Sequence, residues 1–139
     1  MAEGSPLEVY RRLVDDVWNR GDEDAITAIF HPDFVGYDPA PPRLIDGPAG
    51  MRRFVAEMRA AFPDWTVHTD DIVTNGDRLV SRWTVRATHQ GAFAGLAATG
   101  RRVEIHGMSI HRIVDGQIRE NWHAVDRLGL LLQLGAEVR

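Results

Sequence analysis

Apolar residues in the first half of the chain recur at three- and four-residue spacing, which is typical of one face of a helix. A first stripe follows Ser5-Pro6, a helix cap with a proline in the first turn, and Gly21 ends it. A second short helix is expected over Asp22–Phe30, before the break at His31-Pro32-Asp33 and an extended segment at Phe34–Asp38. These patterns predict two helices and then a short extended run.

A third helix is predicted between two prolines. Pro48 opens it, one apolar stripe runs along it, and Pro63 ends it. After Pro63 the period changes from helical to alternating, which is typical of strands. The expected strands are Trp65–Val73, Leu79–His89, Val103–Ile113 and Ile118–Val125. Helices followed by four antiparallel strands predict an α+β fold, in which a curved sheet packs against the helices and leaves a small-molecule cavity.

Composition narrows the function classes. A length of 139 residues suits one domain over residues 1–139, and the longest apolar run is too short to span a membrane. The N-terminal segment Met1–Pro6 has no basic patch followed by an apolar stretch, so we expect a cytoplasmic protein and no membrane partner. The net charge of -4, with basic residues that are scattered or paired along the chain, argues against a nucleic-acid partner. Cysteine is absent, which excludes disulfides and thiolate chemistry.

The chain resembles the SnoaL-like polyketide cyclases, a group within the larger family that has the nuclear-transport-factor-2-like, or cystatin-like, fold. The resemblance rests on the order and spacing of short motifs along nearly the whole chain. They are Asn19-Arg20-Gly21-Asp22, His31-Pro32-Asp33-Phe34, Phe62-Pro63-Asp64-Trp65, Thr88-His89-Gln90-Gly91, Thr99-Gly100-Arg101, Arg112–Ile118 and Gln133-Leu134-Gly135. It implies a cone-shaped α+β barrel, a homodimer or higher homo-oligomer, and a pocket for acid/base chemistry that uses no metal or organic cofactor.

The hairpin turn near residue 115 decides which side chains share the pocket. If Asp115-Gly116 is a two-residue turn, His123 lies opposite Met108. If Gly116 is the left-handed residue of a three-residue loop with a bulge, His123 lies opposite Gly107. A change of register by one residue exchanges the two faces of the sheet.

The resemblance favours the bulged turn, because the cyclases place pocket residues at the positions of Gly107, Ser109 and His123. Ser109 would then lie opposite Asn121. On the other face we expect Glu104, His106 and Glu120.

His123 is the first catalytic candidate. In the family's ester cyclases this position is an aspartate, which acts as the acid/base of an aldol ring closure. Those cyclases also carry a histidine on the preceding strand, and the corresponding residue here is Ser109. An imidazole with an ordinary pKa of about 6.5 can also transfer protons near neutral pH. The alternative is a structural histidine bonded to a backbone carbonyl.

Asp38 is the second catalytic candidate. Its position resembles that of the general-base aspartate of ketosteroid isomerases, which are distant relatives. An aspartate before Pro39 is also a common turn initiator. In a regular strand Tyr37 points away from Asp38, so only one of the two can line the pocket.

Four further residues are candidates for substrate binding, each beside an ordinary alternative. Arg82 either holds a carboxylate or a carbonyl oxygen inside the cone, or lies on the outer face. His89 either shapes the loop at the pocket mouth or is exposed, and His111 shares the parity of Ser109 and reaches the pocket rim. Trp65 belongs to a set of large side chains that either line a cavity for a flat apolar ligand or pack on one another. The others are Trp18, Phe34, Phe54, Met58, Phe62 and Phe93.

Other chemistries lack their motifs. Histidines are not paired on one element with a third ligand, so we expect no metal site, and neither a serine-hydrolase elbow nor a dinucleotide fingerprint is present. The expected ligand is a small aromatic or polyketide-like molecule, and the expected activity is ring closure in a polyketide or related polycarbonyl substrate. The alternatives are a relative that assists hydroxylation or epoxide opening, an isomerase resembling the ketosteroid isomerases, or a non-catalytic binding protein.

The C-terminal segment Leu128–Gly135 is too apolar to lie in water. We expect it either to cover the cone or to pack on a second subunit.

Overall fold

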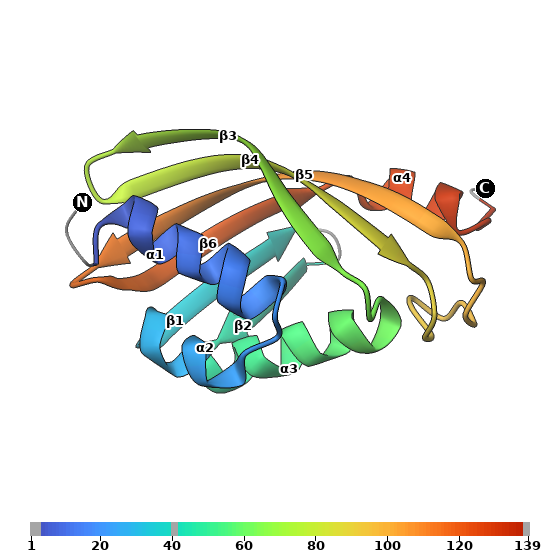
Figure 1. Ribbon diagram of the computed structural model, residues 1–139, viewed down its shortest axis with the longest axis horizontal. Helices are drawn as coiled ribbons and strands as arrows, with labels where there is room; N and C mark the ends of the chain where they lie inside the picture. The colour runs from blue at the N-terminus through green and yellow to red at the C-terminus, as the bar shows by residue number, and fades with distance from the viewer. Residues whose placement is uncertain (1–3, 40–41, 138–139) are drawn as a thin grey trace.

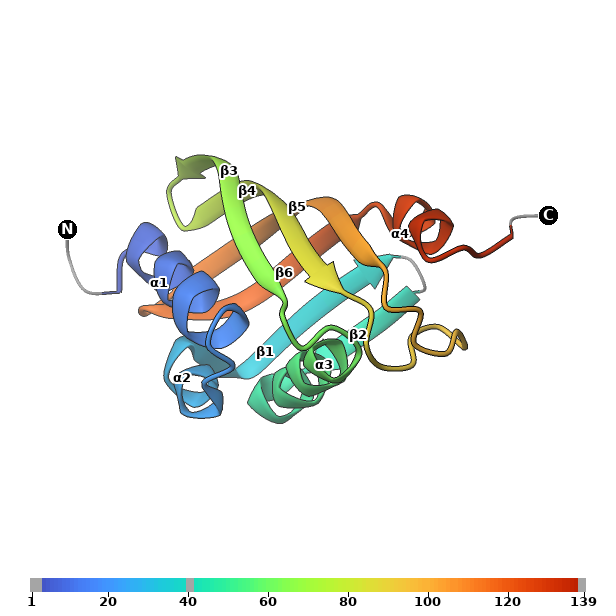
Figure 2. The same cartoon turned by 45° about the vertical axis from the view of Figure 1, so that its right-hand side comes forward.

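A curved six-stranded sheet that does not close into a barrel forms one layer of the computed structural model, which describes residues 4–39 and 42–137 (Figure 1). Its strands, in the order β2-β1-β6-β5-β4-β3, are β1 (Phe30–Pro39), β2 (Pro42–Asp46), β3 (Thr66–Asn75), β4 (Arg78–Thr88), β5 (Arg102–Val114) and β6 (Gln117–Val125). The helices are α1 (Pro6–Arg12), η1 (Leu13–Trp18), α2 (Glu23–Ile29), α3 (Gly47–Ala61) and α4 (Arg127–Gln133). The first three α-helices cover the concave side of the sheet, which confirms the expected α+β class (Figure 2).

The first helical stripe begins and ends where the sequence predicts. The Ser5 hydroxyl accepts a hydrogen bond from the Glu8 backbone N–H at 3.3 Å and so caps α1. After about two turns the helix widens into the π-helix η1, where the Asn19 N–H reaches back to the Val14 carbonyl at 2.9 Å. Gly21 then leaves the helix with a φ of 69°.

Two strands, β1 and β2, form in the region where the sequence predicts one extended segment, Phe34–Asp38. β1 runs antiparallel to β2 and parallel to β6, so the sheet is mixed rather than purely antiparallel. Residues 31–33, which were expected to separate the second helix from the extended segment, lie within β1. The pairing of β1 with β6 shifts register between Phe30 and Val35, because Pro32 has no N–H to donate. β2 is short and begins at a proline, and Ala40 and Pro41, which precede it in the sequence, lie outside the described residues.

The hairpin between β5 and β6 corrects the expected register. Asp115 and Gly116 both have positive φ, 52° and 76°, and form a two-residue turn of the type that matches strand twist. The bulge expected at Gly116 is therefore wrong. An extra residue, Arg119, lies instead in β6, between the pairs Ile113–Ile118 and Arg112–Glu120.

The bulge at Arg119 puts His123 opposite Ser109, rather than opposite Met108 or Gly107. Ser109 is therefore not opposite Asn121, which pairs with His111. Both the expected and the observed register put odd-numbered residues of β5 and β6 on the same face. The expected inner face is therefore correct although the expected turn is wrong. The expected bulge at Gly116 and the observed bulge at Arg119 each shift the register by one residue, and so direct the same side chains inward.

Two apolar clusters fill the space under the sheet. The larger lies beneath α1, η1, α2 and the first half of α3, and the smaller lies near the end of α3, β4, β5 and α4. Leu130 and Leu134 of the C-terminal segment are buried in the smaller cluster, whereas Leu128 and Leu132 are exposed. The segment therefore covers its own fold through two leucines. None of the helices in the described part of the chain is long and apolar enough to cross a membrane.

Candidate active site

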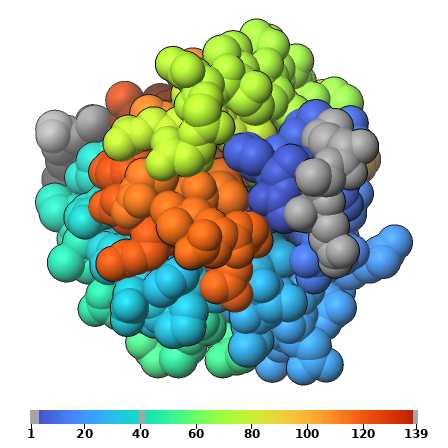
Figure 3. Space-filling model, turned by 90° about the vertical axis from the view of Figure 1, so that its left-hand side faces the viewer, coloured from blue at the N-terminus to red at the C-terminus, as the bar shows by residue number. Residues whose placement is uncertain are grey.

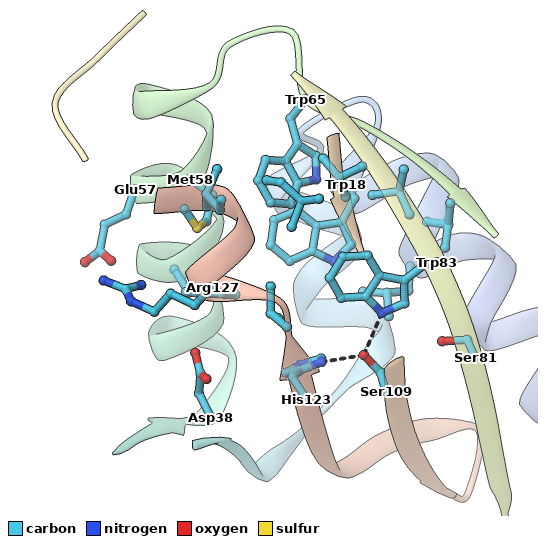
Figure 4. Close-up of a pocket in the computed structure, with 18 of the residues that line it drawn as sticks. Trp18, Asp38, Glu57, Met58, Trp65, Ser81, Trp83, Ser109, His123 and Arg127 are labelled. Atoms are coloured by element: carbon cyan, nitrogen blue, oxygen red, sulfur yellow. Dashed lines mark hydrogen bonds between the residues drawn. The ribbon is translucent and has the colours of Figure 1, made fainter. Parts of the chain in front are cut away.

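A cavity of about 410 Å³ lies between the concave face of the sheet and the helices. This volume is within the range of small-molecule sites. Figure 4 shows side chains from the sheet, α3 and α4 converging on it. Its lining includes Tyr10, Trp18, Asp38, Arg43, Phe54, Glu57, Met58, Trp65, Ser81, Trp83, Phe93, Ser109, His111, His123, Arg127 and Leu130. The aromatic rings and the few polar groups fit a flat ligand with several oxygen atoms.

Strand alternation decides which residues of β4 enter the cavity. Ser81 and Trp83 line it, whereas Arg82 lies between them on the opposite face of the sheet. The Arg82 side chain is 56% exposed, and its guanidinium lies 3.9 Å from the Asp70 carboxylate. The expectation that Arg82 binds a ligand inside the cone is therefore not met, because its parity directs it outward.

A chain of hydrogen bonds crosses the inner face of the sheet. The indole N–H of Trp83 donates to the Ser109 hydroxyl at 2.9 Å, and that hydroxyl lies 2.6 Å from Nδ1 of His123 (Figure 4). An indole N–H can only donate, whereas a serine hydroxyl can both accept and donate. Ser109 therefore fixes the imidazole through Nδ1 and leaves Nε2 for another group.

Gly107 provides the space for this arrangement. It lies opposite Trp83 in the β4–β5 pairing, and a Cβ at this position would come within 2.3 Å of the indole ring. Any residue larger than glycine would push the indole away from Ser109. The close approach of ring and backbone is therefore a condition of the hydrogen-bonded chain.

Burial makes both cavity histidines weak bases. It lowers the pKa of His123 to about 4, and the negative charge of Asp38 opposes this shift. Burial also lowers the pKa of His111 to about 3, with a smaller contribution from His123, whose ring lies 5.9 Å away. Both imidazoles are therefore uncharged at neutral pH.

Charged side chains lie around the more exposed end of the cavity. Arg43 pairs with Glu57 at 3.0 Å, and the Arg127 guanidinium lies 5.4 Å from the centre of the Phe93 ring. Asp38 also lines the cavity, and Figure 4 shows its carboxylate on the same side as His123 and below Arg127.

Tyr37 lies outside this cavity, as expected if Asp38 lines it. Its ring stacks on Trp122 at 5.7 Å on the outer side of the sheet. There it contributes to a shallower hollow that Asp38 and His123 also reach. A ligand in the cavity between the sheet and the helices is therefore out of reach of the Tyr37 ring.

The three other expected substrate-binding residues have different positions. Trp65 lines the cavity and stacks on Trp18 at 5.4 Å. His111 also lines it, but the side chain is buried far from the rim where it was expected. His89 is buried outside the cavity, and its Nδ1 accepts a hydrogen bond from the Thr99 backbone N–H at 3.2 Å. That bond fastens the loop that carries Phe93, so His89 shapes the loop without reaching a ligand.

Trp83 is the main residue of the site that was not predicted. On its strand Arg82 was the candidate, because a charged side chain offers more obvious chemistry. The β4–β5 pairing sets Trp83 opposite Gly107 on the face that Ser109 shares, and this pairing is a tertiary contact that the sequence does not show. Arg43, Glu57 and Arg127 were also missed. Arg43 belongs to the short strand β2, and the other two lie on helices whose further cavity-lining residues are apolar.

Within residues 4–39 and 42–137, no group of three or more His, Asp or Glu side chains is arranged to hold a metal ion.

Comparisons with known proteins agree with this architecture. The model of a family described as SnoaL-like polyketide cyclase matches residues 8–134. The chain is 30% identical, over 93% of its length and 90% of the relative's, to the aklanonic acid methyl ester cyclase DnrD of Streptomyces peucetius.

Two solved structures are similar. AclR of Streptomyces galilaeus, described as a proposed hydroxylase, is 35% identical with a TM-score of 0.79, and the match covers 91% of this chain and 92% of AclR. TsrD of Streptomyces laurentii is 29% identical with a TM-score of 0.86, and the match covers 99% of both chains.

Proposed function

Because the chain belongs to the SnoaL-like polyketide cyclase family, we propose that it closes a ring in an aromatic polyketide or related polycarbonyl substrate by acid/base chemistry. The observation that supports this most is the hydrogen-bonded chain from Trp83 through Ser109 to His123, which ends at the wall of an apolar cavity. His123 is the acid/base group of this proposal, and Asp38 assists it.

The proposed reaction begins with removal of a proton from a carbon between two carbonyl groups. The unprotonated Nε2 of neutral His123 takes that proton, while Nδ1–H donates to the Ser109 oxygen. The imidazolium that forms lies near the negative charge of Asp38, which favours it electrostatically. The lowered pKa of His123 then makes the imidazolium a strong acid for the second half of the reaction.

In the second half the enolate carbon attacks a ketone carbon of the same molecule. One carbon–carbon bond forms, the ketone oxygen becomes an alkoxide, and the imidazolium returns the proton to that oxygen. The product is an isomer of the substrate. A serine hydroxyl suits this cycle because it can accept from Nδ1–H and can equally donate to an unprotonated Nδ1.

The substrate class follows from the relatives. DnrD acts on a methyl ester of a polyketide acid, and the family name specifies polyketides. We propose a methyl ester or similar uncharged polycarbonyl compound, because the inner half of the cavity holds aromatic rings and neutral imidazoles.

Hydroxylation is the second candidate. The similarity to AclR favours it, and so does the histidine at position 123, where the resemblance leads us to expect an aspartate in ester cyclases. A hydroxylase would use the same cavity but add one oxygen atom of dioxygen to its ligand, with a supplied two-electron reductant that converts the second oxygen atom to water.

Mass spectrometry of the product separates the two candidates. With aklanonic acid methyl ester as the test substrate, ring closure gives a product of unchanged mass, whereas hydroxylation gives a product heavier by one oxygen. Unchanged substrate after prolonged incubation with folded protein would contradict ring closure of this ester.

Deuterium exchange tests the first proton transfer by itself. In deuterium oxide the protein should catalyse exchange at the carbon between the carbonyls faster than cyclised product appears. Asp38→Asn should slow this exchange, whereas the matched change Asp71→Asn on exposed β3 should leave it unaltered. Equal exchange in the Asp38 variant would remove Asp38 from the mechanism.

We also propose that the protein is a homodimer that pairs through the outer face of the sheet. One apolar residue from each strand forms a continuous row there, namely Leu44, Tyr37, Trp122, Ile110, Val80 and Val73. Two of the neighbouring arginines are paired, Arg112 with Glu120 at 2.6 Å and Arg82 with Asp70, and the Arg78 guanidinium lies 5.5 Å from the centre of the Trp122 ring.

Analytical ultracentrifugation tests the dimer. Ile110→Glu in the middle of the row should yield a monomer, and the matched change Leu128→Glu on exposed α4 should not. A monomeric wild-type protein would contradict the proposal. The cytoplasmic location and the single domain stay predictions.

A further inference from the structure

Three polar side chains at the inner end of the sheet have no hydrogen-bond partner among the described residues. They are Ser81, His111 and Asn121, and each is at most 2% exposed. The atoms concerned are the Ser81 hydroxyl, Nδ1 of His111 and both amide atoms of Asn121. A buried polar group without a partner destabilises the folded state, so three together need an explanation.

Ser81 and His111 share the cavity wall. Ser81 pairs with Ser109 across β4 and β5, and His111 follows Ser109 by two residues on the same face. Diagonal neighbours of this kind are separated by roughly 7–8 Å, so a single oxygen atom between the two side chains can approach both. Figure 4 shows the Ser81 hydroxyl directed toward the side where Ser109 lies.

These groups lie at the closed end of the cavity. The buried residues Tyr10, Leu13 and Val14 of α1 and η1 complete the wall there. Figure 3 views this end of the molecule, where α1, α2 and the turns after β3 and β5 form a continuous surface outside the grey residues. The charged mouth near Arg43 and Arg127 lies toward the other end of the cavity.

We propose that Ser81 and His111 form a second polar subsite, which holds a ring hydroxyl or keto oxygen at the inner end of the polycyclic ligand. A neighbouring carbon of the same ligand then meets His123, whose ring lies 5.9 Å from that of His111. The inference rests on the proposed function for the class of ligand, but it assigns residues that take no part in the proposed proton transfers. A hydroxyl suits the pair because it donates to one neighbour and accepts from the other.

The electrostatics favour an uncharged oxygen at this subsite. Burial keeps His111 neutral at physiological pH. Tyr10, whose ring lies 5.7 Å from His111, bonds through its hydroxyl to Thr69 at 2.9 Å and adds no charge. Among the described residues that line this end, none carries a positive charge to pair with an anion.

Two soluble probes test the subsite without requiring turnover. Alizarin red S carries ring hydroxyls, whereas anthraquinone-2-sulfonate has the same fused rings and a sulfonate but no hydroxyl. Isothermal titration calorimetry should give a wild-type Kd at least roughly tenfold lower for the hydroxylated probe. In the double variant Ser81→Ala/His111→Phe, the ratio of the two Kd values should fall to within about threefold.

Ser81→Ala alone should lower the ratio by about threefold, which keeps the test available if the double variant does not fold. The matched control is Thr84→Val on the same strand, whose hydroxyl bonds to Asp70 outside the cavity, and it should keep the wild-type ratio. Circular dichroism checks that each variant is folded.

The possible results separate the subsite from the proposed function. If both probes bind the wild type equally, or if folded variants keep its ratio, the subsite is overturned while the ring-closing activity stands. If neither probe binds, the cavity does not take fused aromatic ligands, and the subsite falls together with the proposed ligand class.

Discussion

The two faces of the same sheet use histidine in different ways. On the outer face of β5, His106 is 61% exposed and lies 3.6 Å from the Glu104 carboxylate, as part of a surface network of charges. On the inner face His111 and His123 line the cavity and are buried among mostly apolar side chains. Water surrounds the outer histidine, whereas burial lowers the pKa of the inner two to about 3 and 4.

Residue type is therefore a weaker guide to chemistry here than the face on which the residue lies. Arg82 and Trp83 are adjacent in sequence, yet the charged one pairs with Asp70 at the surface and the aromatic one positions Ser109. A charged side chain on the outer face interacts mostly with water, and its ion pair contributes little. On the inner face even one hydroxyl acts in a medium where hydrogen bonds are stronger.

The largest expected effect comes from the inner histidine that faces the reaction. His123→Ala should lower kcat/KM for ring closure by roughly 100- to 10,000-fold, because it removes the group that transfers the proton. The matched outer change, His106→Ala, should leave kcat/KM within about twofold. Thermal unfolding of both variants checks the fold, and similar losses in the two would erase the difference between the faces.

The inner histidines should also make stability depend on pH. Their folded-state pKa values of about 4 and 3 lie below the ordinary 6.5, so the unfolded chain binds more protons as the pH falls below 6.5. The free energy of unfolding should be highest above pH 6.5 and should fall toward pH 4, by up to ~1.4 kcal/mol per pH unit for each histidine.

Urea unfolding between pH 4 and pH 7 measures this dependence. His111→Phe should reduce the slope by removing one titrating group, whereas the outer change His106→Gln should not alter it. A wild-type slope retained in His111→Phe would mean that His111 is not protonated on unfolding in this window.

Gly107→Ala should disrupt the packing of the Trp83 ring on the inner face of the sheet through a steric clash. The added Cβ would come within 2.3 Å of the Trp83 ring, so the indole must move into the cavity and lose its bond to Ser109. We expect a loss of roughly 1–3 kcal/mol in the free energy of unfolding, together with lower activity. Met108→Ala, next to it on the outer face, should change stability by less than about 0.5 kcal/mol. A Gly107→Ala protein as stable and active as the wild type would contradict the close packing.

Trp83→Phe should have a smaller effect, since it keeps an aromatic ring and removes one donor. The loss of one hydrogen bond to Ser109 should lower the free energy of unfolding by about 1 kcal/mol. It should also change the pH profile of kcat, because Ser109 bonds to Nδ1 of His123. Trp122→Phe on the outer face, which has stacking to Tyr37 but no such bond to the site, should leave that profile in place. An unaltered profile in Trp83→Phe would reduce Trp83 to a packing role.

The smallest effect is expected at the outer arginine. Arg82→Met should change the free energy of unfolding by less than about 0.5 kcal/mol, because its pair with Asp70 is exposed. Activity should be unchanged within about twofold. A loss of activity above tenfold, measured on folded protein, would mean that Arg82 reaches the ligand after all.

Much of the fold was predictable because it depends on local patterns. The change from helical to alternating period located the boundary between the helices and the four long strands, and Ser5 and Gly21 marked the ends of the first helical stretch. The strand β2 was missed because five residues that begin at Pro42 carry too little periodicity. Its place at the edge depends on pairing with β1, which is a tertiary contact.

The candidate site was predictable only in part. Motifs and parity brought His123, Ser109 and Asp38 to one cavity, and the position of Trp65 also agreed. They did not reveal that Arg82 and Tyr37 face outward, that His89 supports a loop, or that His111 lies at the closed end.

By itself the sequence determined the family, the α+β class and the parity of the inner face, because these follow from the order of elements, the composition of turns and the two-residue period of strands. The tertiary structure decided which residues meet. The bulge at Arg119 brings His123 opposite Ser109, and the glycine at position 107 admits the indole that holds that serine. Both depend on atoms from different strands approaching within a few ångströms, and the period of a single strand contains no information about its neighbour.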